Sequence, residues 1–143
     1  MSFDLTGAVE RSSSFTIEKL RQYTPAQVEV TFAAGSGLES GIFTGVPLWD
    51  LLKDARLKIR SERKGDLLRK YLLITGSDGY QAVLSLAEVL PDYGGEPVLV
   101  AYQRDGQPLG ADRGMAQLVI PRDKRGGRYV DRIVRIEVRD PEP

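Results

Sequence analysis

Alternation of hydrophobic and polar residues predicts short β-strands along much of this chain. Residues 28–32 and 133–138 alternate with a period of two, which is typical of strands that are buried on one face. Further strands are expected over residues 3–9, 71–75, 80–85, 98–103 and 118–120. The sequence Gly76-Ser77-Asp78-Gly79 separates two of these strands, so it predicts a tight hairpin turn.

Helical periodicity is confined to short segments between the strands. Thr16 offers an N-cap for a helix over residues 17–23, which has to end before Pro25 because the residue preceding a proline avoids the helical region. Pro47 suits the first turn of a second helix. The apolar stripe of this second helix, expected in the core, consists of Leu48, Trp49, Leu51, Leu52 and Ala55. Residues 86–90 can form one or two further helical turns.

The order of these elements predicts an α+β fold with strand-rich mixed sheets and short helices. The glycine-rich residues 35–41 are expected to form a loop. Because no repeat, low-complexity tract or linker interrupts the chain, we expect a single domain over residues 1–143. Residues 98–102 are the longest apolar run and are far shorter than the roughly twenty residues that span a bilayer, so we expect no membrane span.

Composition narrows the chemistry that this chain can perform. It contains neither Cys nor His, which excludes histidine-based triads, cysteine nucleophiles, and metal sites that depend on those ligands. The first residues do not have the pattern of a signal peptide, but a mature protein would look the same. The expected location is therefore periplasmic or secreted if a signal peptide has been removed, and cytoplasmic otherwise.

Charge is balanced overall, with 20 basic and 20 acidic residues, but it is unevenly distributed. The first basic segment, residues 56–70, is expected to be a solvated surface. The second begins at residue 122 and places four cations around Gly126-Gly127: Arg122, Lys124, Arg125 and Arg128. Guanidinium groups and glycine N–H groups could hold a phosphate or carboxylate there, the alternative being a charged turn before an edge strand. Neither segment interleaves aromatic residues, so nucleic acid is not an expected partner.

Three motif matches fail because their surroundings are wrong. Residues 35–41 approach a dinucleotide fingerprint, but Ser40 stands where its last glycine belongs. Residues 61–64 match Ser-x-x-Lys without the companion motifs of penicillin-recognising enzymes. Asp50 and Asp54 are four residues apart but have no partner motif, so a solvated helix face is expected for them.

Several segments, in order, resemble the molybdopterin-binding domain of the sulfite oxidase family of oxidoreductases. Residues 45–48 (GVPL) resemble the start of a characteristic helix of that family, and Asp78-Gly79-Tyr80 resembles the turn before its pocket-side strand. The other matching segments are residues 3–9, 15–20, 105–109, 114–121 and 128–138. The resemblance covers nearly the whole chain, and it implies molybdopterin as cofactor, with Asp78, Tyr80 and the second basic segment towards the cofactor side.

The resemblance also implies a missing metal ligand. In active members, molybdenum is held by two pterin sulfurs and by one cysteine thiolate that precedes the Gly-x-Pro-Leu helix. The corresponding position here is Ala33, whose methyl group cannot bind a metal. Met115 or Ala116, and Gln117, stand where the family has proline and arginine.

Three functional hypotheses follow. The first is a non-catalytic domain that binds a small anionic ligand or docks to a redox partner protein. The second is a molybdopterin-dependent oxidoreductase that binds its cofactor without a protein thiolate, with water or an acid such as Asp78 at the open metal position. The third is a secreted structural module.

Overall fold

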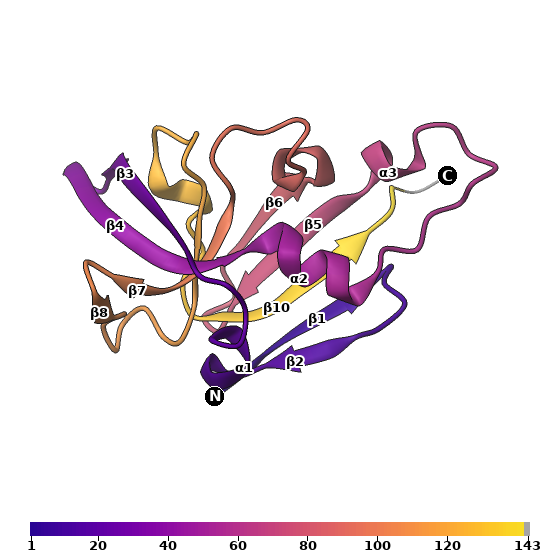
Figure 1. Ribbon diagram of the computed structural model, residues 1–143. Helices are drawn as coiled ribbons and strands as arrows, with labels where there is room; N and C mark the ends of the chain where they lie inside the picture. The colour runs from indigo at the N-terminus through magenta and orange to yellow at the C-terminus, as the bar shows by residue number, and fades with distance from the viewer. Residues whose placement is uncertain (142–143) are drawn as a thin grey trace.

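The computed structural model describes residues 1–141, which form two β-sheets of five strands each (Figure 1). The first sheet contains, in spatial order, β2 (Ser13–Phe15), β1 (Phe3–Gly7), β10 (Ile133–Arg139), β5 (Tyr71–Gly76) and β6 (Gln81–Ser85). Strands β1 and β10 are parallel, and the other neighbouring pairs are antiparallel. The first and last strands of the chain therefore lie side by side, as the indigo and yellow strands of Figure 1 show.

The second sheet is antiparallel throughout and includes the longest strands of the molecule. It contains, in order, β3 (Ala26–Ala34), β4 (Gly37–Pro47), β7 (Leu99–Arg104) and β8 (Gln107–Pro108), with β9 (Gln117–Val119) also paired to β7. In Figure 1 the hairpin of β3 and β4 extends to the upper left, away from β5 and β6. The strand-rich α+β architecture predicted from the sequence is confirmed.

The glycine-rich stretch 35–41 is not the predicted loop. Only Gly35 and Ser36 turn the chain, and Gly35 does so with a positive φ of 57°. From Gly37 onward the residues pair in register with β3, beginning with Ala34. Pairing with β3 satisfies the backbone hydrogen bonds of these residues, and this outweighs the low strand propensity of glycine.

All helices are short: α1 (Ile17–Leu20), α2 (Leu48–Ala55), α3 (Asp66–Arg69), and the 3-10 helices η1 (Leu86–Val89) and η2 (Gly126–Arg128). The predicted N-cap is confirmed, because the Thr16 side chain accepts a hydrogen bond from the Lys19 N–H at 3.2 Å. Helix α1 ends earlier than expected. Helix α2 begins at Leu48, so Pro47 is the last residue of β4 and does not lie in the first helical turn.

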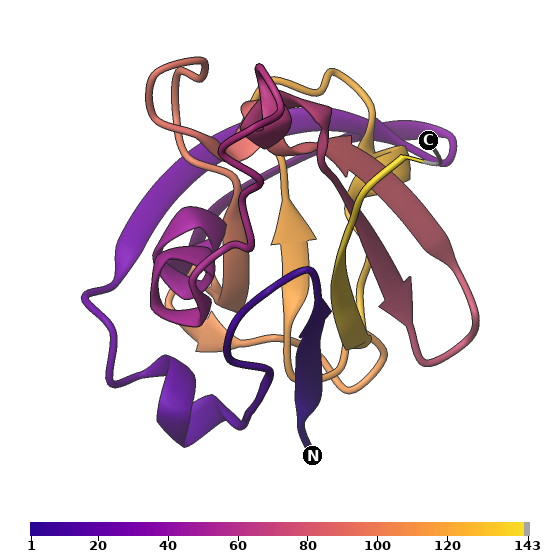
Figure 2. The same cartoon turned by 90° about the vertical axis from the view of Figure 1, so that its right-hand side faces the viewer.

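Buried side chains from both sheets and from α2 form one hydrophobic cluster. Leu48, Leu51 and Leu52 are fully buried, as the apolar stripe predicts. Trp49 is only partly buried: it packs against the core but keeps part of its surface exposed, because it lies at the edge of that stripe. Helix α2 lies beneath the curve of β4 on one side of the molecule, and the hairpin of β5 and β6 lies on the other (Figure 2).

The first basic segment is not solvated throughout, contrary to the prediction. Asp66 and Lys70, at the two ends of α3, are both buried. The Lys70 Nζ lies 2.7 Å from a carboxylate oxygen of Asp140 and 3.5 Å from one of Asp66. Burying these charges is tolerable because they neutralise one another. No helix within residues 1–141 has the length and apolar character needed to cross a membrane.

Candidate functional site

The second basic segment lies between the edge strands of the two sheets. On one side, Ala33 in β3 donates its N–H to the Lys124 carbonyl at 2.8 Å and forms an isolated parallel bridge with Arg125. On the other side, the Arg128 guanidinium donates to the Val83 carbonyl in β6 at 3.2 Å. The segment that contains η2 therefore joins β3 to β6, and it brings Ala33 next to the cations that the sequence singled out.

The turn before β6 contributes to the same region through Tyr80. Its hydroxyl donates a hydrogen bond to the Gly127 carbonyl. Asp78 does not point to this segment: one of its carboxylate oxygens accepts from the Tyr80 N–H, and the other lies 3.0 Å from the Arg132 guanidinium. The structure thus joins Ala33, Tyr80 and the basic segment, and it gives Asp78 another partner.

Aromatic packing fixes the position of this segment. The ring centroids of Phe32 and Tyr129 are 4.4 Å apart, and the Tyr129 hydroxyl donates a hydrogen bond to the Ile120 carbonyl at 3.2 Å. Burial raises the pKa of Tyr129 to about 12, with a contribution from the charge of Asp123, so this hydroxyl keeps its proton. A Cβ on Gly126 would come within 2.8 Å of the Phe32 ring, so only glycine allows this close approach.

Arg128 organises the segment through five hydrogen bonds to protein oxygens. Besides the Val83 carbonyl, its guanidinium holds both carboxylate oxygens of Asp123 and both of Glu88. The hydrogen bonds that Arg128 donates to Asp123 and then to Glu88 raise its pKa still further. Every N–H of this guanidinium already has an acceptor, so Arg128 shapes the segment and does not present a free cation.

The remaining cations face an open hollow of about 490 Å³ lined by residues 122–125, 127 and 128. Arg122 donates to the Tyr93 carbonyl at 3.1 Å, which holds its side chain near the rim. Lys124 and Arg125 are exposed, and within residues 1–141 their side chains have no recorded ion pair or hydrogen bond. These two side chains are therefore the ones available to an anionic ligand.

The residues of this region do not fit a molybdenum centre that takes a ligand from the protein. Ala33 offers only a methyl group, and strand alternation places it on the face of β3 opposite buried Phe32. Asp78, the alternative ligand, is paired with Arg132. In the part of the chain that the structure describes, no three side chains of His, Cys, Asp or Glu gather closely enough to hold a metal ion.

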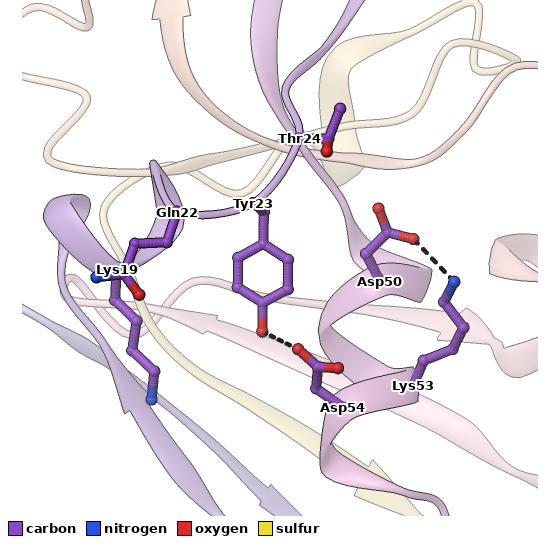
Figure 3. A pocket seen from close by; sticks show the side chains of 7 residues that line it. All are labelled: Lys19, Gln22, Tyr23, Thr24, Asp50, Lys53 and Asp54. Carbon is purple, nitrogen blue, oxygen red and sulfur yellow. Dashed lines mark hydrogen bonds and ion pairs between the residues drawn. The ribbon is translucent and has the colours of Figure 1, made fainter.

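A separate cleft of about 610 Å³ lies between α1 and α2 (Figure 3). The Tyr23 hydroxyl points across it and donates to a carboxylate oxygen of Asp54, while Lys53 lies 3.5 Å from Asp50. Burial and the hydrogen bond to Asp54 raise the pKa of Tyr23 well above its usual value, so the phenol remains a donor. Both carboxylates have partners. The hydrogen bond from Tyr23 to Asp54 joins the segment that follows α1 to α2.

Sequence reasoning did not find the partners that organise the basic segment. Glu88, Asp123 and Arg132 were not candidates, although each forms an ion pair with a predicted site residue. One local signal was available: Ser85 and Glu88 are three residues apart and form a capping box at the start of η1. That pattern marks a helix start, but it does not indicate the contact with Arg128.

Comparisons with known proteins agree with this architecture. A family model described as the oxidoreductase molybdopterin binding domain matches residues 1–143. No curated protein sequence matches the chain. The crystal structure of the sulfane dehydrogenase SoxCD from Paracoccus pantotrophus superposes with a TM-score of 0.81 at 21% sequence identity. The match covers 98% of this chain but only 38% of that one, so this chain corresponds in fold to part of a longer polypeptide.

Proposed function

The chain belongs to the family of oxidoreductase molybdopterin-binding domains, and we propose that it acts within that family as a non-catalytic domain that binds a small anion. In this proposal Lys124 and Arg125 hold the ligand in the hollow beside Ala33, and Arg122 contributes at the rim. Arg128 positions the segment without touching the ligand. Sulfite oxidase-type redox chemistry would require a metal ligand that this region does not contain.

The observation that supports the proposal is that the four cations differ in their partners. Arg128 is neutralised by Glu88 and Asp123, both within 2.9 Å of its guanidinium. Lys124 and Arg125 have no such partner among the described residues and lie on the same hollow. Two exposed cations on a rigidly held loop attract an anion such as a phosphate, since the loop is already ordered before the ligand binds.

The missing thiolate supports a non-catalytic role over the oxidoreductase hypothesis. A molybdenum ion takes soft sulfur ligands, and this chain has no cysteine. Asp78 would have to leave Arg132 before it could replace a thiolate. The hollow retains features suited to an anion while the position expected for the metal ligand holds a methyl group.

Calorimetric titration with inorganic pyrophosphate tests the proposal directly. We expect wild-type protein to bind it, with affinity falling as ionic strength rises because the cations are exposed. Lys124→Ala and Arg125→Ala should each weaken binding by about five-fold, the upper end for an exposed charge pair. Lys64→Ala is the matched control: it removes an exposed cation from the first basic segment and should leave the affinity unchanged.

The same protein, purified from a host that makes molybdopterin, should be analysed for molybdenum and released pterin. Stoichiometric molybdenum with pterin would contradict a non-catalytic role and favour the oxidoreductase hypothesis. Equal pyrophosphate affinity in wild type and in both variants would instead place any anion site elsewhere. The two measurements therefore test the two halves of the proposal separately.

A further inference from the structure

A second cavity, of about 300 Å³, lies between the start of α2 and the loop that connects η1 to β7. Pro47 and Trp49 form the wall on the side of α2. Leu90, Pro91 and Pro97 contribute to the wall on the side of the loop. The volume and the mainly apolar walls are those of a small-molecule site.

Trp49 has the exposure that such a site requires. It packs against the hydrophobic core but is not covered by it, unlike Leu48, which is fully buried. The surface of the indole that the core leaves free lines the cavity. Prolines on both walls restrict the backbone around it, so an apolar group can enter without ordering flexible chain.

The charged residues that line the cavity are all acidic, and one of them has no recorded partner within residues 1–141. Three lining residues are acidic, Asp50, Glu88 and Glu96, and none is basic. Asp50 pairs with Lys53, and Glu88 pairs with Arg128. The exposed Glu96 carboxylate has no recorded hydrogen bond or ion pair within residues 1–141. An apolar cavity with an indole and one uncompensated negative charge is complementary to a single positive charge on an apolar body.

We propose that this cavity binds a small organic monocation, a primary amine with an apolar body. The apolar part packs against Trp49 and the prolines, and the ammonium group lies towards Glu96, where the carboxylate and the indole both attract it. This site has no lining residue in common with the basic hollow and has the opposite charge. The Glu88–Arg128 ion pair links the walls of the two sites, but the residues proposed to contact the ligands are different, so either proposal can fail without the other.

Trp49 is the only tryptophan of the chain and it lines this cavity, so its fluorescence reports on binding there. We would titrate the full-length protein with 2-phenylethylamine and with two probes of similar shape, 2-phenylethanol and 3-phenylpropionate. The amine should perturb the fluorescence at the lowest concentration, the alcohol should bind about five-fold more weakly, and the carboxylate should bind weakest. Equal binding of amine and alcohol, stronger binding of the carboxylate, or no response to the amine would overturn the proposal.

Two variants locate the charge preference. Glu96→Gln keeps the shape of the side chain and the Trp49 reporter, and it should remove most of the preference for amine over alcohol. Asp92→Asn is the matched control, because Asp92 is an exposed carboxylate of the same loop that does not line the cavity. If both variants reduce amine binding equally, the amine responds to general charge and not to a site at Glu96, and the proposal is wrong.

Discussion

The two basic segments look alike in the sequence, but the structure uses their cations differently. In residues 56–70, the cation that is most completely paired, Lys70, is buried between Asp66 and Asp140 at the end of the segment. In residues 122–128, the most completely paired cation is Arg128, which also comes last in its range but is partly exposed. The first arrangement attaches Asp140, which follows β10, to the end of α3, and the second shapes a loop.

The two arrangements differ in whether the unpaired cations line a hollow. Exposed cations of the first segment, such as Lys64, line none of the hollows described above. Lys124 and Arg125 line one, because Arg128 holds the loop around Gly126-Gly127 in place beside β3. A count of positive charges therefore does not identify an anion site. In the proposed anion site, one cation is committed to the fold and the others face a concave surface.

The largest effect is expected from Lys70→Met. This variant leaves the carboxylates of Asp66 and Asp140 without their shared cation, in a place where the Lys70 side chain is 1% exposed. We expect a loss of about 2–3 kcal/mol in the free energy of unfolding, somewhat below the range for fully buried pairs because Asp140 is partly exposed. Urea denaturation measures it, with Lys64→Met as the control that should change stability by less than about 0.5 kcal/mol.

Adding Asp66→Asn to Lys70→Met should recover part of that loss, because one of the stranded charges is removed. If Lys70→Met is no more destabilising than Lys64→Met, the buried pairing does not stabilise the fold, and the proposed contrast between the two segments disappears.

Much of the fold could be predicted from local patterns. The hairpin of β5 and β6, the N-cap at Thr16 and the buried stripe of α2 follow from periodicity and turn residues within a few positions of one another. Prediction from local sequence was wrong where pairing with another strand determined the secondary structure. Residues 37–41 became a strand because β3 lies beside them, and glycine content alone predicted a loop.

The candidate site was less predictable, because its ion pairs connect positions far apart in the sequence. Glu88 and Arg128 are 40 residues apart, and Lys70 and Asp140 are 70 apart. No spacing rule links such residues, so the sequence could show that cations cluster but not which of them are neutralised. The exposed part of Trp49 was missed for a similar reason: the loop that faces it follows 40 residues or more after it along the chain.

A smaller effect is expected from Arg128→Ala. Removing the guanidinium leaves Glu88 and Asp123 facing each other without a cation, and it removes the link to β6. We expect a loss of about 1–2 kcal/mol in the free energy of unfolding, reduced from the value for a buried pair because all three side chains are partly exposed. Urea denaturation measures this loss, and comparison with Arg125→Ala supplies the control.

Pyrophosphate affinity should also fall in Arg128→Ala, because the loop loses its shape. Arg128→Lys keeps the positive charge but cannot form the five hydrogen bonds of the guanidinium. It should therefore not restore the affinity of the wild type. Full rescue by lysine would show that Arg128 acts as a charge on the ligand and not as a positioning residue.

The smallest effect is expected in the acid dependence of stability. Partial burial alone would raise the pKa of Glu88, but the hydrogen bonds from Arg128 and the Ser85 N–H outweigh it and hold the pKa below its usual 4.5. The pKa of Asp66 is held below its usual 3.8, first by the Arg60 N–H and then by Lys70. Both groups therefore bind protons more weakly in the folded state, and the stability they contribute is lost as pH falls below those usual values.

The pKa values of Glu88 and Asp66 are lowered by different groups. The stabilities of Arg128→Ala and Lys70→Met should therefore depend differently on pH. Arg128→Ala removes the main cause of the lowered pKa of Glu88, so its stability should fall less steeply than that of the wild type as the pH drops below 4.5. Lys70→Met leaves the Arg60 N–H on Asp66, so it should keep much of the wild-type slope. Urea denaturation at several pH values measures both slopes. Equal flattening in the two variants would mean that Lys70 controls Asp66 as fully as Arg128 controls Glu88, and that the two segments handle their carboxylates in the same way.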